Sequence, residues 1–186
     1  MATRHRPGIL CLEGAWDPKL TSTSTVASIL ELLRSQQAIE YAHKDVATPT
    51  ELNHYLNKWL QKQYANLDVG YLAFHGEPGV IFLGRKRVTL DDIAGMLDGR
   101  GRGRILHFGS CSTLDVPLAE IREFLSVTKL RAICGYRSDV DWIESAAFEV
   151  LLIDSLSHYK RVDAAYNWMK KNYPGMCRRL KFKMVW

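Results

Sequence analysis

Short apolar runs alternate along this chain with longer stretches in which apolar residues recur at helical spacing. Continuous apolar runs of a few residues are typical of strands that are buried on both faces of a sheet. The stretches between them predict helices. This alternation is typical of one α/β domain with a mostly parallel sheet. The expected strands cover residues 8–13, 38–46, 69–74, 105–108 and 130–134.

Sequence signals for helix starts stand between these strands. Thr48, Pro49 and Glu51 combine an N-cap, a first-turn proline and a capping-box glutamate. Thr89 and Asp92 begin another helix, which Gly99 ends. Two further helices are expected after N-caps, one after residues 22–25 and one after Asp115.

The last two expected helices cover residues 142–155 and 162–171, and Pro174 is expected to end the second. The residues expected on the buried side of the first are Ile143, Ala147, Val150, Leu151 and Asp154.

Two segments depart from the strand–helix alternation. Residues 80–83, followed by Arg87 and Val88, predict a small hairpin that turns near Gly84. The tail from Leu180 to Met184 alternates strictly between apolar residues and lysine. It predicts a half-exposed strand at a sheet edge, where lysines discourage pairing with another chain.

Length and composition fit one folded domain over residues 1–186. The 186 residues are 47% hydrophobic and 24% charged, which is ordinary for a globular protein. No apolar stretch approaches the roughly 18 residues that cross a bilayer, and the run Ile9–Leu12 is too short for a signal-peptide core. The four cysteines lack close paired spacing, which favours free thiols. We therefore expect a cytoplasmic protein without membrane contact.

The net charge of +5 gives only weak support for a nucleic-acid partner. Basic residues cluster at 85–87, in the loop 99–104 and at 178–183. The loop 99–104 precedes a strand and does not open a helix, so it lacks the helix N-terminus that binds phosphate. A basic surface loop is the better interpretation, and binding of nucleic acid is not expected.

The candidate chemistry lies at the ends of two apolar runs. His75 follows the run 69–74, and Cys111 follows the run 105–108 after two small residues. Because ligand and catalytic groups gather at the carboxyl ends of parallel strands, the two side chains are expected to meet at one sheet edge. Each residue alone has a structural interpretation, as a core cysteine or a buried histidine. Together they suit a cysteine nucleophile with an imidazole base.

Small residues complete this candidate site. Gly76 directly follows the histidine, so its backbone N–H and that of Cys111 can both bind a developing oxyanion. A metal is not expected, because His107 and Cys111 are four residues apart without a second pair to complete a ligand set. A nucleotide-binding, flavodoxin-like domain is disfavoured, because residues 13–17 after the first strand lack a phosphate-loop glycine pattern.

The stretch Tyr71–Thr113 resembles the caspase-like cysteine peptidases of clan CD, and most closely their CHAT branch. Strand-His-Gly, hairpin, helix and strand-Gly-Ser-Cys-Ser-Thr follow one another in the same order, and a weaker resemblance extends to Ser155. The resemblance implies a three-layer α/β/α sandwich with six strands in the order 2-1-3-4-5-6, the last one antiparallel. It implies peptide hydrolysis by His75 and Cys111 through a thioester acyl-enzyme, with no metal or organic cofactor.

The preference for the residue before the scissile bond does not follow from the resemblance, because Gly109 and Ser110 depart from the residues that precede the cysteine in caspases and metacaspases. Carboxylates at the same sheet edge favour a basic residue there, whereas Arg137 favours an acidic one. Each charge can equally be a solvated loop group or a helix cap. The candidates for binding a basic side chain are Asp139 and Asp141, followed by Glu13 and Asp17.

The sequence leaves open whether the protein is a binding module and whether a partner protein controls it. The alternative to a peptidase is an inactive caspase-like module that serves as a binding or scaffold partner, its basic loops meeting an acidic protein or nucleic acid. Because the fold uses nearly the whole chain, we expect that a partner protein regulates any activity. The resemblance to the CHAT branch implies a role in a bacterial toxin or immune-type system.

Overall fold

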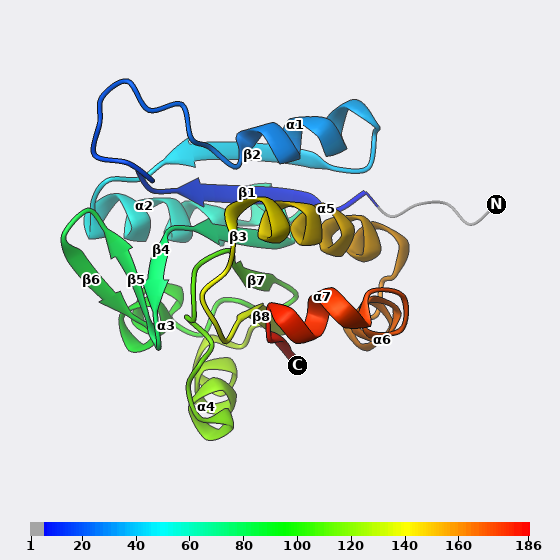
Figure 1. Cartoon of the computed structure of the whole chain (residues 1–186). Helices are drawn as coiled ribbons and strands as arrows, with labels where there is room; N and C mark the ends of the chain where they lie inside the picture. The colour runs from blue at the N-terminus through cyan, green and yellow to red at the C-terminus, as the bar shows by residue number, and fades with distance from the viewer. Residues whose placement is uncertain (1–5) are drawn as a thin grey trace.

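The computed structural model describes residues 6–186 and has three layers, with helices on both faces of a six-stranded sheet (Figure 1). Residues 1–5, at the start of the segment considered for a signal peptide, lie outside the described part. The order β2-β1-β3-β7-β8-β9 is parallel except for β9, which confirms the expected architecture. The strands are β1 (Gly8–Glu13), β2 (Glu40–Asp45), β3 (Val69–Ala73), β7 (Ile105–Phe108), β8 (Ala132–Tyr136) and β9 (Phe182–Val185).

Successive residues of the central strands face opposite layers of helices. In β1, Ile9 and Cys11 face one core and Leu10 and Leu12 face the other, and all four are buried. This double burial explains why β1 is apolar at every position and does not alternate. One core contains α1 (Ala27–Ser35), α5 (Trp142–His158), α6 (Val162–Asn172) and α7 (Pro174–Arg179); the other contains α2 (Pro49–Trp59), α3 (Leu90–Leu97) and α4 (Leu118–Thr128).

Two of the expected helix starts are confirmed in atomic detail. Thr48 and Glu51 form the capping box of α2, and Thr89 and Asp92 form that of α3. Asp115 does not cap α4, which follows Pro117 without a side-chain cap; the Asp115 carboxylate instead pairs with Arg137 at 3.1 Å.

Two expectations about the C-terminal helices are wrong. Pro174 begins α7, as suits a residue without an N–H at a first helical position, and α6 already ends at Asn172. The buried face of α5 is carried by Phe148, Glu149 and Leu152, whereas Ile143 is 72% exposed. The helix is apolar around much of its circumference, so spacing alone does not define its inner face.

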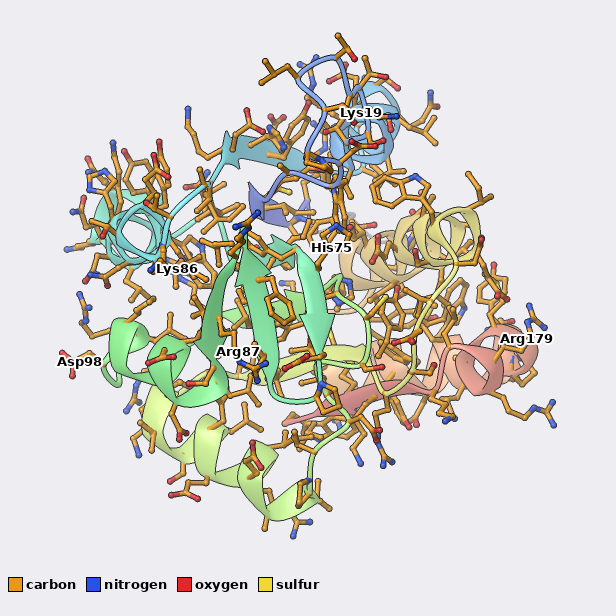
Figure 2. All side chains as sticks on the ribbon, turned by 60° about the vertical axis from the view of Figure 1, so that its left-hand side comes forward. Lys19, His75, Lys86, Arg87, Asp98 and Arg179 are labelled. Atoms are coloured by element: carbon orange, nitrogen blue, oxygen red, sulfur yellow. The ribbon has the colours of Figure 1, made fainter. Side chains whose placement is uncertain are left out.

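The small hairpin has one strand more than the sequence indicates. β4 (His75–Glu77) pairs with β5 (Val80–Leu83), which pairs with β6 (Lys86–Thr89), all antiparallel. β4 begins two residues after β3 ends, so the chain passes directly from the central sheet into the hairpin. His75 stands at this junction, as Figure 2 shows.

The basic loop 99–104 contributes one arginine to the interior. Arg104 is 7% exposed, and its guanidinium donates hydrogen bonds to the backbone carbonyls of Trp59, Tyr64 and Leu67. The interpretation of this loop as a basic surface loop is therefore wrong for Arg104, which fixes the connection that leads to β3. Among residues 6–186, no helix combines the length and apolarity that crossing a membrane requires.

Candidate active site

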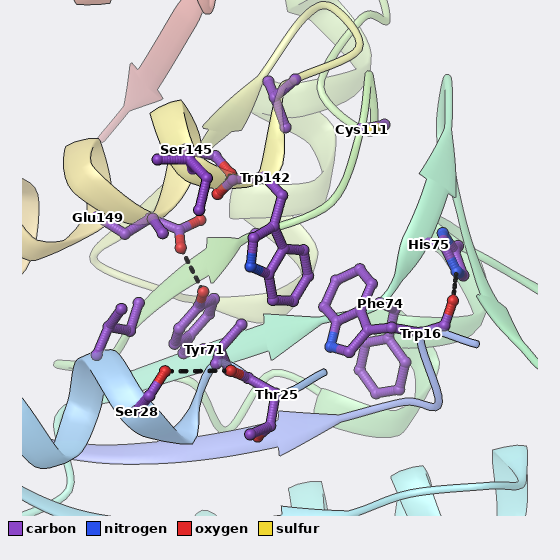
Figure 3. Close-up of a pocket in the computed structure, with 16 residues that line it drawn as sticks. Trp16, Thr25, Ser28, Tyr71, Phe74, His75, Cys111, Trp142, Ser145 and Glu149 are labelled. Carbon is purple, nitrogen blue, oxygen red and sulfur yellow. Dashed lines mark hydrogen bonds between the residues drawn. The ribbon is translucent and has the colours of Figure 1, made fainter. Parts of the chain in front are cut away.

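A pocket of about 310 Å³ opens at the carboxyl ends of β1, β3 and β7 and contains both His75 and Cys111 in its lining (Figure 3). The loop after β1 contributes Trp16, and the first turns of α5 contribute Trp142 and Glu149. The predicted meeting of the histidine and the cysteine at one sheet edge thus corresponds to a real cavity. Its walls are mainly aromatic and aliphatic.

The imidazole of His75 is oriented by the loop that follows β1. Its Nε2 lies 2.9 Å from the backbone carbonyl oxygen of Trp16. A carbonyl oxygen can only accept, so Nε2 carries the hydrogen and Nδ1 is the basic nitrogen of the neutral ring. The Trp16 indole also contacts the imidazole edge-on, with ring centroids 5.2 Å apart. Trp16 therefore fixes both the tautomer and the orientation of His75.

Glu13 holds the Trp16 loop in place. Its buried carboxylate accepts hydrogen bonds from the Trp16 indole N–H at 2.5 Å, the Thr25 hydroxyl at 2.7 Å and the Val26 amide at 2.7 Å, and contacts His43 Nε2 at 2.6 Å. Burial alone raises the pKa of Glu13, but these hydrogen bonds outweigh burial and lower it. Glu13, a predicted substrate contact, lies outside the pocket of His75 and Cys111.

Backbone hydrogen bonds shape the turn that carries Cys111. Ser112 has a positive φ of 52°, a conformation rarely adopted by residues other than glycine, and its amide donates to the Ser138 carbonyl at 3.0 Å. The Ser112 hydroxyl donates to Asp139 at 2.8 Å. The backbone amide of Cys111 itself donates no hydrogen bond to any atom of residues 6–186. It is thus free to bind an oxyanion.

Gly76 packs directly against the cysteine turn. A Cβ atom at this position would lie 2.4 Å from Thr113 Oγ1 and 2.8 Å from the Cys111 carbonyl oxygen, closer than atoms can approach. Only glycine lets the start of β4 come this near to Cys111. Within the described part of the chain no hydrogen bond joins the Cys111 thiol to the His75 ring, although both face the same pocket.

The other predicted substrate contacts lie around this pocket but not in its lining. Asp17 accepts a bond from the Lys19 amide at 2.8 Å and faces a second hollow. Asp139 accepts the Ser112 hydroxyl and so supports the cysteine turn. Asp141 caps α5 by accepting hydrogen bonds from the amides of Ile143 and Glu144, both at 2.9 Å. The helix cap was the alternative to substrate binding for this residue.

The sequence interpretation missed Glu149, which among residues 6–186 is the one acidic residue in the pocket lining. It is 3% exposed and accepts hydrogen bonds from the hydroxyls of Tyr71 at 2.5 Å and Tyr136 at 3.1 Å, while His107 Nε2 lies 3.3 Å away. Cys134 Sγ lies 3.4 Å from the other nitrogen of His107. Burial lowers the pKa of His107, but Cys134 and Glu149 raise it to about 10. A glutamate amid the apolar residues of α5 was the available signal.

One group of side chains has the composition of a metal site. Ligand atoms of Glu13, His43 and Asp45 lie within 4.8 Å of one another. The Glu13 carboxylate already accepts three hydrogen bonds and contacts His43. This contact raises the pKa of His43, although burial alone would lower it. These interactions explain the group as a structural anchor of the Trp16 loop.

The sheet order, with His-Gly after β3 and the cysteine turn after β7, defines a caspase-like α/β/α fold. The chain is similar to the crystal structure of caspase-1 from Spodoptera frugiperda, with a TM-score of 0.54 and 14% identity over 98% of this chain and 85% of that chain. The chain belongs to a family of unknown function, DUF6642, whose model matches residues 7–186. No curated protein matches it. Neither comparison points to the CHAT branch.

Proposed function

We propose that this protein is a cysteine endopeptidase in which Cys111 is the nucleophile and His75 the general base and acid. The observation that carries the proposal is the shared pocket, in which the His75 ring is oriented by the Trp16 carbonyl beside a partly exposed cysteine. A thiol becomes a strong nucleophile as a thiolate, and a nearby imidazole stabilises that form. The caspase-like fold supports this assignment by analogy.

The reaction proceeds in two balanced halves. His75 Nδ1 takes the thiol proton, and Cys111 Sγ attacks the carbonyl carbon of the scissile bond. As the carbon–nitrogen bond breaks, the imidazolium gives that proton to the leaving amine, and a thioester remains on Cys111. A water molecule, deprotonated by His75, then attacks the thioester, which releases the carboxylic acid and returns the proton to the thiol.

The oxyanion formed in both halves needs hydrogen-bond donors that are in place before the reaction. We assign this role to the amides of Cys111 and Gly76. The unused Cys111 amide and the close packing of Gly76 on the same turn support the assignment. Fixed donors of this kind are commonly worth on the order of 10²–10³ in rate.

The test is cleavage of a peptide library by the wild type and by Cys111→Ala and His75→Ala. Cys177→Ala and His54→Ala are matched controls, because Cys177 is buried in the core and His54 is exposed on α2. Both site variants are expected to lose cleavage, and both controls to retain it. Cleavage that survives both site substitutions would remove the proposed pair.

An inactive caspase-like binding module is the second candidate function. The observation that favours it is the lack of a hydrogen bond between Cys111 and His75 in the described chain. This module would bind an acidic protein through surface arginines such as Arg85 and Arg102. No cleavage by the wild type under any condition, with unchanged partner binding by Cys111→Ala, would favour this candidate over the peptidase.

We further propose that a partner protein controls the activity, within a bacterial defence system of the CHAT type. The support is the resemblance of residues 71–113 to the CHAT branch. Purification that yields a free monomer with full peptidase activity would contradict this control. We also propose a preference for a basic residue before the scissile bond.

A further inference from the structure

The pocket beside Cys111 has the position of a binding site for one substrate side chain. It extends from Gly109 and Cys111 at the cysteine turn to Glu149 on α5. If Cys111 attacks a peptide carbonyl, as proposed above, the side chain just before the scissile bond lies next to the mouth of this pocket. Its volume of about 310 Å³ accommodates a long side chain.

Three aromatic side chains form much of the wall. Trp16, Phe74 and Trp142 line the pocket, and the two tryptophans meet edge-on with ring centroids 4.7 Å apart (Figure 3). Aromatic faces pack well against a hydrocarbon stem and attract a cationic head group. No lysine or arginine lines this pocket among residues 6–186.

The inner end of the pocket presents a carboxylate with unused acceptor capacity. Glu149 Oε1 contacts Tyr136 and His107, whereas Oε2 accepts only the Tyr71 hydroxyl within the described chain. An ionised carboxylate has about four lone-pair sites, so Oε2 can accept one more donor. An apolar side chain placed against it would leave this buried acceptor unpaired, which is unfavourable. A side chain that ends in N–H donors would satisfy it.

Gly109 keeps this carboxylate close to the cysteine turn. A Cβ atom at Gly109 would lie 2.4 Å from the Tyr71 ring and 3.0 Å from Glu149 Oε1. The bare backbone therefore lets Tyr71 and Glu149 approach the segment that leads to Cys111. This explains the glycine at a position where the sequence departs from caspases.

The hollow next to this pocket carries an excess of carboxylates. This hollow shares Trp16 in its lining and carries Asp17, Asp45 and Glu51 against one cation, Lys19. Excess negative charge at the rim of a cleft raises the local concentration of cationic ligands. An acidic side chain would meet the Glu149 carboxylate in the pocket.

We propose that Glu149 makes this pocket selective for arginine or lysine immediately before the scissile bond. This inference rests on the proposed peptidase function. The specificity-determining carboxylate is thus a buried residue of α5, while Asp139 and Asp141 support the cysteine turn and cap the helix.

The first test compares peptide substrates that differ only in arginine or citrulline before the scissile bond, because citrulline keeps the shape and removes the charge. For the wild type, kcat/KM for arginine should exceed that for citrulline by roughly tenfold or more. Glu149→Gln should bring the ratio near one with little change for citrulline. Glu144→Gln is the matched control, because it removes a carboxylate of the same helix that pairs with Arg179 outside the pocket, and it should keep the wild-type ratio.

A second measurement separates the specificity from the chemistry. Benzamidine, a small planar cation, should bind to the Cys111→Ala protein. It should not bind to the double variant that carries both Cys111→Ala and Glu149→Gln. If the wild type cleaves after apolar residues and needs Cys111 and His75 to do so, the proposed specificity is wrong and the proposed peptidase function stands. Benzamidine binding without any cleavage retains the specificity and overturns the peptidase. Neither binding nor cleavage overturns both.

Discussion

Two histidine–cysteine pairs of residues 6–186 invite comparison, His75 with Cys111 and His107 with Cys134, and the pair in closer contact is not the one proposed for catalysis. His107 and Cys134 are 3.4 Å apart, and Glu149 contacts the other nitrogen of this imidazole, so the three resemble a triad. Both side chains are almost fully buried within β7 and β8. His75 and Cys111 make no hydrogen bond to each other, yet both face an open pocket.

The difference between the two pairs shows what a nucleophile needs besides a base. Cys134 lies inside a strand, where the backbone amides are used by the sheet and no substrate can reach the sulfur. Cys111 lies in a turn with an unpaired amide, beside a glycine that contacts the same turn. Access and oxyanion donors therefore distinguish the pairs, whereas the distance between histidine and cysteine does not.

The largest effect is expected from replacing His75, and it is to be compared with the effect of replacing His107. His75→Ala should lower kcat/KM by roughly 10²–10⁴, the usual contribution of general acid–base catalysis. His107→Gln should leave most activity in the protein that remains folded. The measurement is kcat/KM of both variants in a peptidase assay, corrected for the folded fraction that circular dichroism gives. Equal losses in the two variants would mean that the buried pair takes part in the reaction.

The buried contact between His107 and Glu149 should instead contribute strongly to the free energy of unfolding. His107→Leu leaves the Glu149 carboxylate without its imidazole partner in the core, and such an unpaired buried charge commonly costs about 3–5 kcal/mol. Urea unfolding measures the free energy of unfolding of this variant. His54→Leu, on the exposed face of α2, is the control and should change it little. A His107→Leu protein as stable as the wild type would contradict the role of the ion pair.

The sequence predicts the central strands, two helix starts and the two candidate site residues because their signals are local, whereas the sheet order follows from the resemblance to caspase-like peptidases. The capping boxes of α2 and α3 and the apolar strands each depend on a few neighbouring residues. β4 was missed because three residues are too few to show a pattern. Glu149 was missed because its role comes from tyrosines on β3 and β8, far away in the sequence. The interior position of Arg104 likewise depends on carbonyls of a distant segment.

A smaller effect is expected from the packing of Gly76 on the cysteine turn. Gly76→Ala places a methyl group against Thr113 Oγ1 and the Cys111 carbonyl, so the turn must shift. Misplacement by about 1 Å can cost roughly 10² in rate, and we expect a loss of up to this size in kcat. Gly95→Ala, where a Cβ meets nothing within 4 Å, should keep full activity. Unchanged kcat in Gly76→Ala would argue against the close fit.

The same buried imidazole also makes stability depend on pH. The pKa of His107 is raised from 6.5 to about 10 in the folded protein, near Glu149, Cys134, Tyr71 and Tyr136. Its stabilising contribution is therefore complete below pH 6.5 and is lost as the pH rises toward 10. Thermal unfolding should show a steeper fall of Tm over this range for the wild type than for His107→Gln. Parallel profiles would indicate a neutral His107.

The central claim is that His75 and Cys111, and not His107 and Cys134, form the reactive pair. The most direct measurement is the rate of alkylation of each cysteine by iodoacetamide in the native protein, followed by mass spectrometry, with and without His75→Ala. The account predicts fast modification of Cys111 that slows in His75→Ala, with Cys134 protected until unfolding. Equal rates at Cys111 in both proteins, or modification of native Cys134 as fast as that of Cys111, would contradict it.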